Sequence, residues 1–171
     1  MPSFVFIGGN AALTFLQSEA TQVATQTVYT FTDANIGPAA ADRYVVVCIT
    51  GSAGTSGRSL SSVSIGGSAA TLDANAASSV PASTTSIAAI ARRLVAAGTT
   101  ATVVATFSAD MLIGYCHVYT LTHALSATPN DTQTTVSGPG TATSLSDTID
   151  VLQGGALLVT ASSATRPATT P

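Results

Sequence analysis

The stretch from Thr99 to Thr122 (TTATVVATFSADMLIGYCHVYTLT) constrains the fold most, because its apolar side chains recur with the two-residue period of a β-strand. The pattern predicts two strands folded back on each other, with the turn at Ser108-Ala109-Asp110. In the second strand nearly every position on both faces is apolar or aromatic. We expect such a strand to be covered on both sides, or to lie in the centre of a sandwich.

Several other segments also favour strands. Arg43 to Thr50 (RYVVVCIT) is β-branched, continuous and bounded by turn residues, which predicts a central strand. Leu60 to Leu72 predicts a hairpin, because Gly66-Gly67 supplies the positive φ angles of a tight two-residue turn. Ser3 to Ile7 predicts a short strand at an edge of the sheet, and Thr21 to Thr32 predicts a half-exposed strand.

Two neighbouring segments give less clear patterns. Ser86 to Gly98 (SIAAIARRLVAAG) fits the apolar stripe of a helix, with its first and last residues as caps, and it also fits a strand. We favour the strand, because its neighbours are strands and sequential strands of a sandwich tend to pair. Asp73 to Thr85 is an Ala/Ser-rich connection, in which Pro81 argues against a regular element.

Together these segments predict an all-β protein, an antiparallel, jelly-roll-like β-sandwich of about eight to ten short strands. A chain of 171 residues is long enough for one domain with a substantial core. We expect an N-terminal strand or attachment segment in residues 1–20, the sandwich in residues 21–161, and an extended Thr/Pro-rich tail in residues 162–171.

Charge is scarce in this chain. Charged residues make up 8% of the sequence, the formal net charge is -3, and the five cations are all arginines. Nucleic acid is not an expected partner, because phosphate neutralisation needs clustered Lys or Arg, and an anionic membrane surface is disfavoured for the same reason. No apolar run is long enough to span a bilayer, and the N-terminus lacks the basic region of a signal peptide. A surface of Ser, Thr and Ala favours burial in an assembly.

No constellation of residues predicts catalysis, a cofactor or a bound metal. Gly51 to Ser59 (GSAGTSGRS) departs from a phosphate-binding loop in its spacing and in its arginine, so a strand connector explains it. His117 and His123 lack a recognisable metal-ligand spacing, and no serine lies in a nucleophile elbow. Asp147 and Asp150 would act as a glycosidase pair only if the fold brought them across a groove, so we expect solvated acids.

The two cysteines, Cys48 and Cys116, each lie inside an apolar strand pattern. We expect both to be buried thiols that pack as small hydrophobic side chains. A disulfide between them would require neighbouring strands in the right register.

Tyr115, His117 and Tyr119 share one face of a predicted strand and are the candidate contact residues of this chain. Packing in the core or at an interface is the favoured interpretation. The alternative is a glycan-binding face, on which these tyrosines, with Tyr29 and Tyr44, would stack sugars. Against that alternative, the chain contains no tryptophan, the ring that usually forms such platforms.

The run from Tyr29 to Gly37 (YTFTDANIG), followed by Ala39 to Val47 (AAADRYVVV), resembles a pattern common in virion proteins of tailed phages and prophages. The similarity continues in Ser62 to Leu72, in Gly98 to Val104 and in the Gly154-Gly155 turn. The resemblance implies a jelly-roll-like structural protein of a phage particle, oligomeric and without enzymatic activity. It also implies that Arg43 is a structural residue, fixed by the acid that precedes it. Similar proteins continue for another pair of strands, so either the last strands are missing or another subunit completes the sheet.

We therefore expect a non-enzymatic virion component, a capsid decoration or a tail or fibre protein, that binds other virion proteins and copies of itself. Its expected location is the surface of the particle, which is assembled in the host cytoplasm. One alternative is a receptor- or glycan-binding module of a tail fibre that contacts host-surface glycan. A second is a hydrolase of cell-wall polymers built on Asp147 and Asp150.

Overall fold

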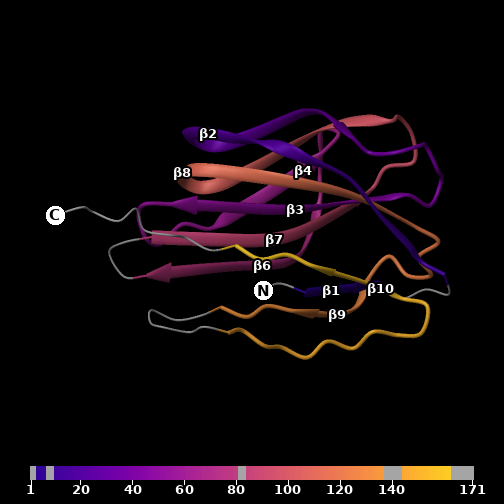
Figure 1. Ribbon diagram of the computed structural model, residues 1–171. Coiled ribbons are helices and arrows are strands. Elements are labelled where there is room, and N and C mark those ends of the chain that lie inside the picture. Colours follow the sequence, from indigo (N-terminus) through magenta and orange to yellow (C-terminus); the bar gives the residue numbers. More distant parts are fainter. Residues whose placement is uncertain (1–2, 7–9, 81–83, 137–143, 163–171) are drawn as a thin grey trace.

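A computed structural model of the chain describes residues 3–6, 10–80, 84–136 and 144–162 (Figure 1). These residues form ten strands, all paired antiparallel, and no helix. The strands are β1 (Ser3–Phe6), β2 (Ala12–Asn35), β3 (Tyr44–Ala53), β4 (Leu60–Ile65), β5 (Ser68–Ala69), β6 (Thr71–Val80), β7 (Thr84–Leu94), β8 (Thr100–Thr122), β9 (Pro129–Gln133) and β10 (Ala156–Val159). The predicted all-β antiparallel class is confirmed.

The strands form two sheets of unequal size. The larger has seven strands in the order β5-β4-β8-β3-β7-β6, with β2 paired to β8, and the smaller has three in the order β10-β1-β9. In Figure 1 the small sheet lies along one flank of the larger one. The prediction of a strand at Ser3 to Ile7 is confirmed, but its expected edge position is wrong, because β1 lies in the middle of the small sheet.

β8 is one continuous strand of 23 residues, so the predicted turn at Ser108-Ala109-Asp110 is wrong. On one side β8 pairs with β2 along its whole length. On the other side, Val103 to Phe107 pair with β4 and Ile113 to Leu121 pair with β3. Residues 108–110 lie at the corner where β8 leaves one partner and meets the next.

The corner is a bulge rather than a chain reversal. Between the pairs Gln26↔Met111 and Val28↔Thr106, β8 carries more residues than β2, and the register shifts there. The polar groups are satisfied locally: Ser108 N–H donates to the Ser59 carbonyl, and Thr27 Oγ1 donates to Asp110 Oδ1 at 2.5 Å. Ser108, Ala109 and Asp110 therefore form a bend within a strand, and such bending is the usual effect of a β-bulge.

The seven-stranded sheet bends at this corner and nearly closes on itself as a sandwich. On the far side, Asn75 Nδ2 of β6 donates to the Leu60 carbonyl of β4 at 3.1 Å. Arg93 of β7 donates to the Ile65 carbonyl at the other end of β4. These contacts hold β4 close to β6 and β7 without a strand ladder between them.

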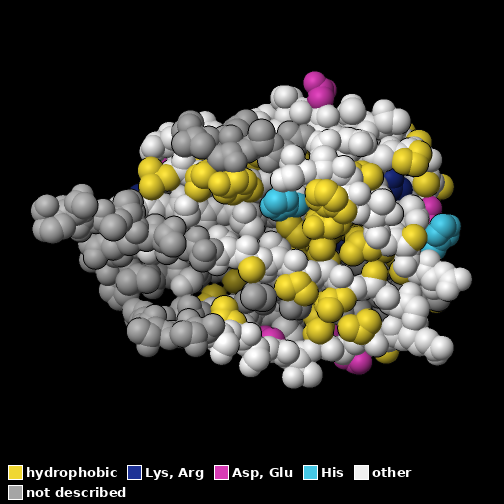
Figure 2. Space-filling model, viewed as in Figure 1, with side chains coloured by type: hydrophobic (Ala, Val, Ile, Leu, Met, Phe, Trp, Pro, Cys, Tyr) yellow, Lys and Arg dark blue, Asp and Glu magenta, His cyan; other side chains and the backbone are white. Residues whose placement is uncertain are grey.

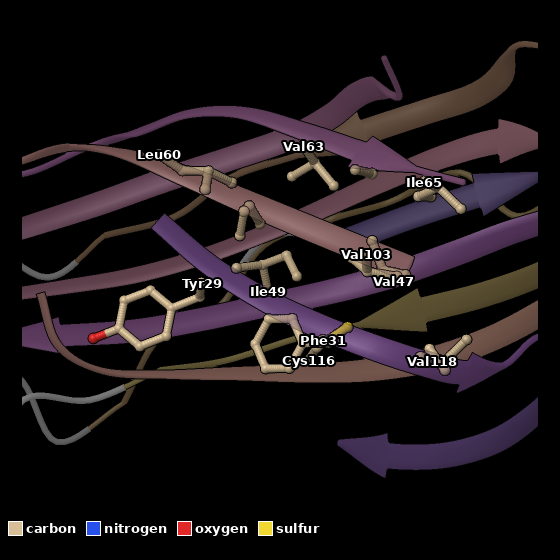
Figure 3. Close-up of a cluster of buried hydrophobic side chains, with 14 of the residues drawn as sticks. Tyr29, Phe31, Val47, Ile49, Leu60, Val63, Ile65, Val103, Cys116 and Val118 are labelled. Atoms are coloured by element: carbon tan, nitrogen blue, oxygen red, sulfur yellow. The ribbon is translucent and has the colours of Figure 1, made fainter. Parts of the chain in front are cut away.

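The main core fills the space that this sheet encloses. Its side chains come from β2, β3, β4, β7 and β8, and several are labelled in Figure 3. Tyr29 lies at the corner of β8, fully buried, with its hydroxyl donating to the Met111 carbonyl at 2.8 Å. Its ring meets that of Phe107 edge to face at 5.7 Å between centroids.

A second core lies between the outer face of the large sheet and the small sheet. Its buried residues are Val46, Cys48, Ala74, Ile90, Leu121 and Leu158. On β3, Val45, Val47 and Ile49 point into the main core, while Val46 and Cys48 point into the second. The prediction that Arg43 to Thr50 forms a central strand is confirmed, because both of its faces are covered and both of its edges are paired.

The less clear segments resolve into strands. Ser86 to Gly98 contains most of β7, so the strand interpretation is confirmed. The hairpin at Gly66-Gly67 is also confirmed, with φ angles of 59° and 76°. The interpretation of Asp73 to Thr85 as an irregular connection is wrong, because β6 occupies Thr71–Val80 and pairs with β7. Residues 81–83, between these two strands, lie outside the described residues.

The expected boundary between the N-terminal segment and the sandwich, at residue 20, falls inside β2. β1, on the other side of that boundary, pairs with β9 and β10. Of the expected tail, only residue 162 lies within the described residues.

Candidate functional site

Tyr115, His117 and Tyr119 lie on the outer face of β8, because Cys116 and Val118 between them point into the main core. All three side chains are half-buried. Across the strand ladder they face Thr50, Cys48 and Val46 of β3. The alternation predicted from the sequence is therefore present, and it leaves three ring side chains in a row on one surface.

Phe15 of β2 adds a fourth ring that the sequence interpretation missed. It is paired in register with Tyr119, and the two ring centroids lie 5.2 Å apart at 59°. Phe15 is 54% exposed. The only signal in the sequence was the two-residue spacing of Leu13 and Phe15 across Thr14, which Leu16 interrupts. We call Phe15, Tyr115, His117 and Tyr119 the aromatic strip. Figure 2 shows hydrophobic side chains gathered beside a histidine near the middle of the face in view.

The electrostatics of the aromatic strip favour uncharged rings. Burial lowers the pKa of His117 below its usual value, so its imidazole is neutral at pH 7. Burial raises the pKa of Tyr119, with a smaller contribution from Cys48. Neutral rings on a sheet face are suited to packing or stacking and are poorly suited to binding an anion.

Two further tyrosines considered for a glycan face lie elsewhere. Tyr29 is fully buried in the main core, so its inclusion among candidate stacking residues is wrong. Tyr44 is half-buried beside the second core, and the Arg92 guanidinium lies 5.8 Å from its ring centroid.

Arg92 forms a buried ion pair that the sequence interpretation did not find. Its Nε lies 2.9 Å from Asp73 Oδ2, and the side chains are 10% and 4% exposed. The contact lacks good hydrogen-bond angles, so the attraction is mainly coulombic. Burial raises the pKa of Asp73 to about 6, although Arg92 acts in the opposite direction. The two residues are distant in sequence, and no local pattern relates them.

Arg43 is buried, as expected for a structural residue, but not through the preceding acid. Its guanidinium donates to five backbone carbonyls, those of Gly37, Pro38, Val95, Ala97 and Gly98, at 2.6–3.0 Å. Asp42 instead accepts the His123 backbone N–H at 2.7 Å, which lowers its pKa. The partner implied by the resemblance is therefore wrong, because carbonyl dipoles from two loops surround the cation.

Asp147 and Asp150 bind neighbouring residues rather than each other. Asp147 accepts from the Thr135 hydroxyl and from the Thr148 N–H, which lowers its pKa. Asp150 Oδ2 accepts from Asn130 Nδ2 at 3.3 Å. Both carboxylates are exposed, and the lowered pKa of Asp147 is the opposite of what a general acid requires.

Within the described residues no group of three or more His, Cys, Asp or Glu side chains is arranged to hold a metal ion. Cys48 and Cys116 are buried thiols, as predicted, and no disulfide joins them. Burial raises the pKa of Cys48 to about 12, so this thiol is unreactive at neutral pH.

The surface of the molecule also carries many exposed apolar side chains. Among the described residues eleven large hydrophobic side chains are exposed: Phe15, Val28, Leu94, Leu112, Leu125, Val136, Leu145, Val151, Leu152, Leu157 and Val159. Six of them lie between residues 136 and 159, in and before β10. The described part of the chain contains no helix with the length and hydropathy needed to cross a bilayer.

Comparison with known proteins gives no family assignment: no protein-family model, no curated protein and no solved structure matches this chain.

Proposed function

We propose that this chain is a non-enzymatic structural component of a tailed-phage particle, a capsid decoration or a tail or fibre protein, that acts by protein–protein assembly. The observation that carries the proposal is the set of eleven exposed large hydrophobic side chains on a chain with only 8% charged residues. Such a surface is poorly protected against association, and contact with neighbouring subunits would cover it. The resemblance of residues 29–47 to virion proteins of tailed phages is the reason why we propose a phage particle as the site of this assembly.

The direct test of this proposal is whether the chain is found on the phage particle. The chain carrying an epitope tag is expressed in cells that produce the phage, and intact particles are purified on a density gradient. We expect the chain to sediment with the particles in a constant ratio to the major capsid protein, and gold-labelled antibody to mark the capsid or tail surface. Recovery of the chain only in the soluble fraction would refute the proposal.

A second candidate function, glycan binding, is favoured by the exposure of Phe15 beside Tyr119. Exposed aromatic rings on a sheet face can stack against the apolar face of a sugar. Binding to a glycan array would be abolished by Phe15→Ala, Tyr115→Ala or Tyr119→Ala. It would be retained by Leu112→Ala, which removes a side chain about as exposed as Phe15 from the strand that carries the two tyrosines. Absence of binding by the unmodified chain would reject this candidate.

A further inference from the structure

β10 is paired along one edge only. It forms a ladder with β1, and within the described residues no other backbone hydrogen bond reaches Ala156–Val159. In an antiparallel ladder every second residue directs its N–H and C=O groups away from the partner strand. Lysine, proline and β-bulges usually protect such an edge, and Ala156–Val159 (ALLV) has none of them. This edge, which we call the open edge, can accept a further strand.

The open edge faces the aromatic strip. Leu158 packs in the second core with Val46 and Cys48 of β3, so β10 lies over β3. β1 and β9 contact β6, so the rest of the small sheet extends from β10 toward β6 and away from β8. On the other side of β10, Tyr119 packs against the same second core, and His117 is the register partner of Cys48. The open edge and the strip therefore border the same outer face of β8.

A strand added at the open edge would lie in the plane of the small sheet, above β8. Neighbouring strands lie about 4.8 Å apart and stacked sheets about 10 Å apart, a layer that side chains fill. Alternate side chains of the added strand would therefore point down onto Tyr115, His117 and Tyr119, which are only half-buried. The added strand would bury the outer face of β8 in the way that β10 buries that of β3.

We propose that the open edge and the aromatic strip together bind one extended segment of a partner protein, which adds to β10 as a further strand of the small sheet. The inference rests on the proposed assembly by protein–protein contact and names the surface that makes it. Main-chain hydrogen bonds to the open edge would supply affinity, and contacts of alternate side chains with the rings would supply selectivity.

Space and area favour a single segment over a second folded copy of this chain. The large sheet extends past β10 by β8 and β2, so a copy that paired its own β10 here would bring its β8 and β2 into the space of these strands. The open edge is four residues, about 13 Å, long, whereas stable contacts between folded subunits bury about 1,200–2,000 Å². An extended segment meets both limits, because it is one strand thick and binds along the edge.

The chemistry of this surface defines the segment. Neither Ala156–Val159 nor the aromatic strip contains Asp, Glu, Lys or Arg. Burial lowers the pKa of His117, so its ring is neutral at pH 7. A charged side chain directed onto these rings would lose hydration without gaining a partner. The segment that fits is therefore uncharged, has apolar or aromatic residues at alternate positions, and has no proline in the paired run.

The probe for the test is a capped, fluorescently labelled peptide of about seven residues in which threonine alternates with valine and phenylalanine. The control peptide has the same side chains and a methyl group on every backbone nitrogen, which removes the donors that strand pairing needs. Fluorescence anisotropy measures binding of each peptide to the unmodified chain. We expect saturable binding of the probe and no binding of the methylated peptide.

Two variants of matched exposure test the aromatic strip. Phe15 and Leu112 are 54% and 50% exposed, and Leu112 lies off the strip, beside Gly54. Phe15→Ala should weaken binding of the probe roughly tenfold, and Leu112→Ala should leave it unchanged. Far-UV circular dichroism checks that both variants are folded.

Amide exchange of the unmodified chain, resolved by NMR at single residues, tests the open edge. With free probe at about ten times its dissociation constant, the amides of β10 that face away from β1 should exchange about tenfold more slowly, because exchange then requires release of the peptide. β9, at the other edge of the small sheet, is the internal control and should not change.

Equal binding of the methylated peptide, slower exchange in β9 instead of β10, or no binding of the probe would overturn this inference. So would an unmodified chain that is dimeric by light scattering and that the probe converts to monomers, because a second copy would then occupy the surface. Binding to glycans without binding to the probe would overturn it and favour the second candidate function. None of these results decides whether the chain is on the particle, which the sedimentation experiment measures separately.

Discussion

Arg43 shows how a single residue can connect segments that are far apart in the sequence. It is the largest of the fully buried side chains, and its five carbonyl partners lie in the loop before β3 and in the segment after β7. The cation is balanced by carbonyl dipoles. Because each bond involves a charged donor, losing them leaves several buried acceptors without partners.

We expect Arg43→Met to lower the free energy of unfolding by at least about 1–3 kcal/mol, the cost of leaving even one buried carbonyl acceptor without a partner. Arg43→Lys should recover only part of the loss, because an ammonium has fewer donors and no planar fork. Urea unfolding followed by circular dichroism is the measurement. Arg58→Lys, at a half-buried position where the guanidinium donates to the Thr55 hydroxyl, is the control and should change the value by less than Arg43→Lys does. Equal effects at the two positions would contradict the role assigned to Arg43.

Asp73 predicts an unusual dependence of stability on pH. Its pKa in the folded chain is about 6, above the usual 3.8, because burial disfavours its charged form. Between about pH 4 and 6 the folded state therefore binds more protons than the unfolded state, and this residue's contribution to stability rises as the pH falls. Above about pH 6 the burial cost of the carboxylate is present in full.

The variant Asp73→Asn isolates this effect. The free energy of unfolding of the unmodified chain, minus that of the variant, should increase as the pH falls from about 7 to 4, by at most roughly 3 kcal/mol. Other carboxylates, such as Asp42 and Asp147, have lowered pKa values and act in the opposite direction, but they are common to both proteins. A difference that stays constant with pH, or decreases toward pH 4, would contradict the assignment.

At the scale of elements, the long β2–β8 ribbon depends on a close fit at the corner of β8. A Cβ atom added to Gly114 would lie 3.0–3.3 Å from ring atoms of Tyr29. That ring is also held by its hydroxyl and by Phe107, so it cannot move away cheaply. The absence of a side chain at residue 114 leaves the room that the Tyr29 ring occupies.

We expect Gly114→Ala to lower the free energy of unfolding by about 1–3 kcal/mol through overpacking. Gly54→Ala is the matched control, because its added Cβ would meet only Leu112 Cδ1 at an ordinary 3.5 Å. Thermal unfolding of both variants and of the unmodified chain provides the comparison. If the cause is the Tyr29 ring, Gly114→Ala should be better tolerated when combined with Tyr29→Leu; an unchanged or greater effect would point to another cause.

At the scale of the whole molecule, the small sheet is held on the large one through the second core. Leu158 is 5% exposed and reaches this core from β10, whereas its neighbour Leu157 is 44% exposed. The small sheet joins β1, β9 and β10, which come from both ends of the chain. The packing of the small sheet on the large one therefore fixes the positions of β1, near the N-terminus, and of β10, near the C-terminus.

Leu158→Ala should weaken this attachment by about 2–4 kcal/mol, the usual cost of a Leu to Ala change in a core. Native-state amide exchange followed by mass spectrometry should show faster exchange in β1, β9 and β10 and little change in β3. Leu157→Ala, on the exposed side of the same strand, should leave exchange unchanged. Faster exchange throughout the molecule would show that the two sheets unfold as one unit.

Much of the fold was predictable from local patterns, because strand alternation is a property of the chain itself. The run of valines before Cys48 identified the central strand, Gly66-Gly67 identified the hairpin, and the apolar residues of Ser86 to Gly98 were assigned correctly to a strand. The alternation of Tyr115, His117 and Tyr119 placed them on one face of β8. Each of these inferences needed only the φ preferences and the spacing of neighbouring residues.

The tertiary structure alone decided the features that depend on distant partners. Ser, Ala and Asp at residues 108–110 fit a turn or a bulge equally well, and contacts with Ser59 and Thr27 select the bulge. The pairs Phe15–Tyr119 and Asp73–Arg92 likewise join strands whose register no local pattern specifies. The physical reason is that strand pairing is non-local: the chain's own alternation sets which side chains share a face, and only the assembled sheets set which strand lies beside them.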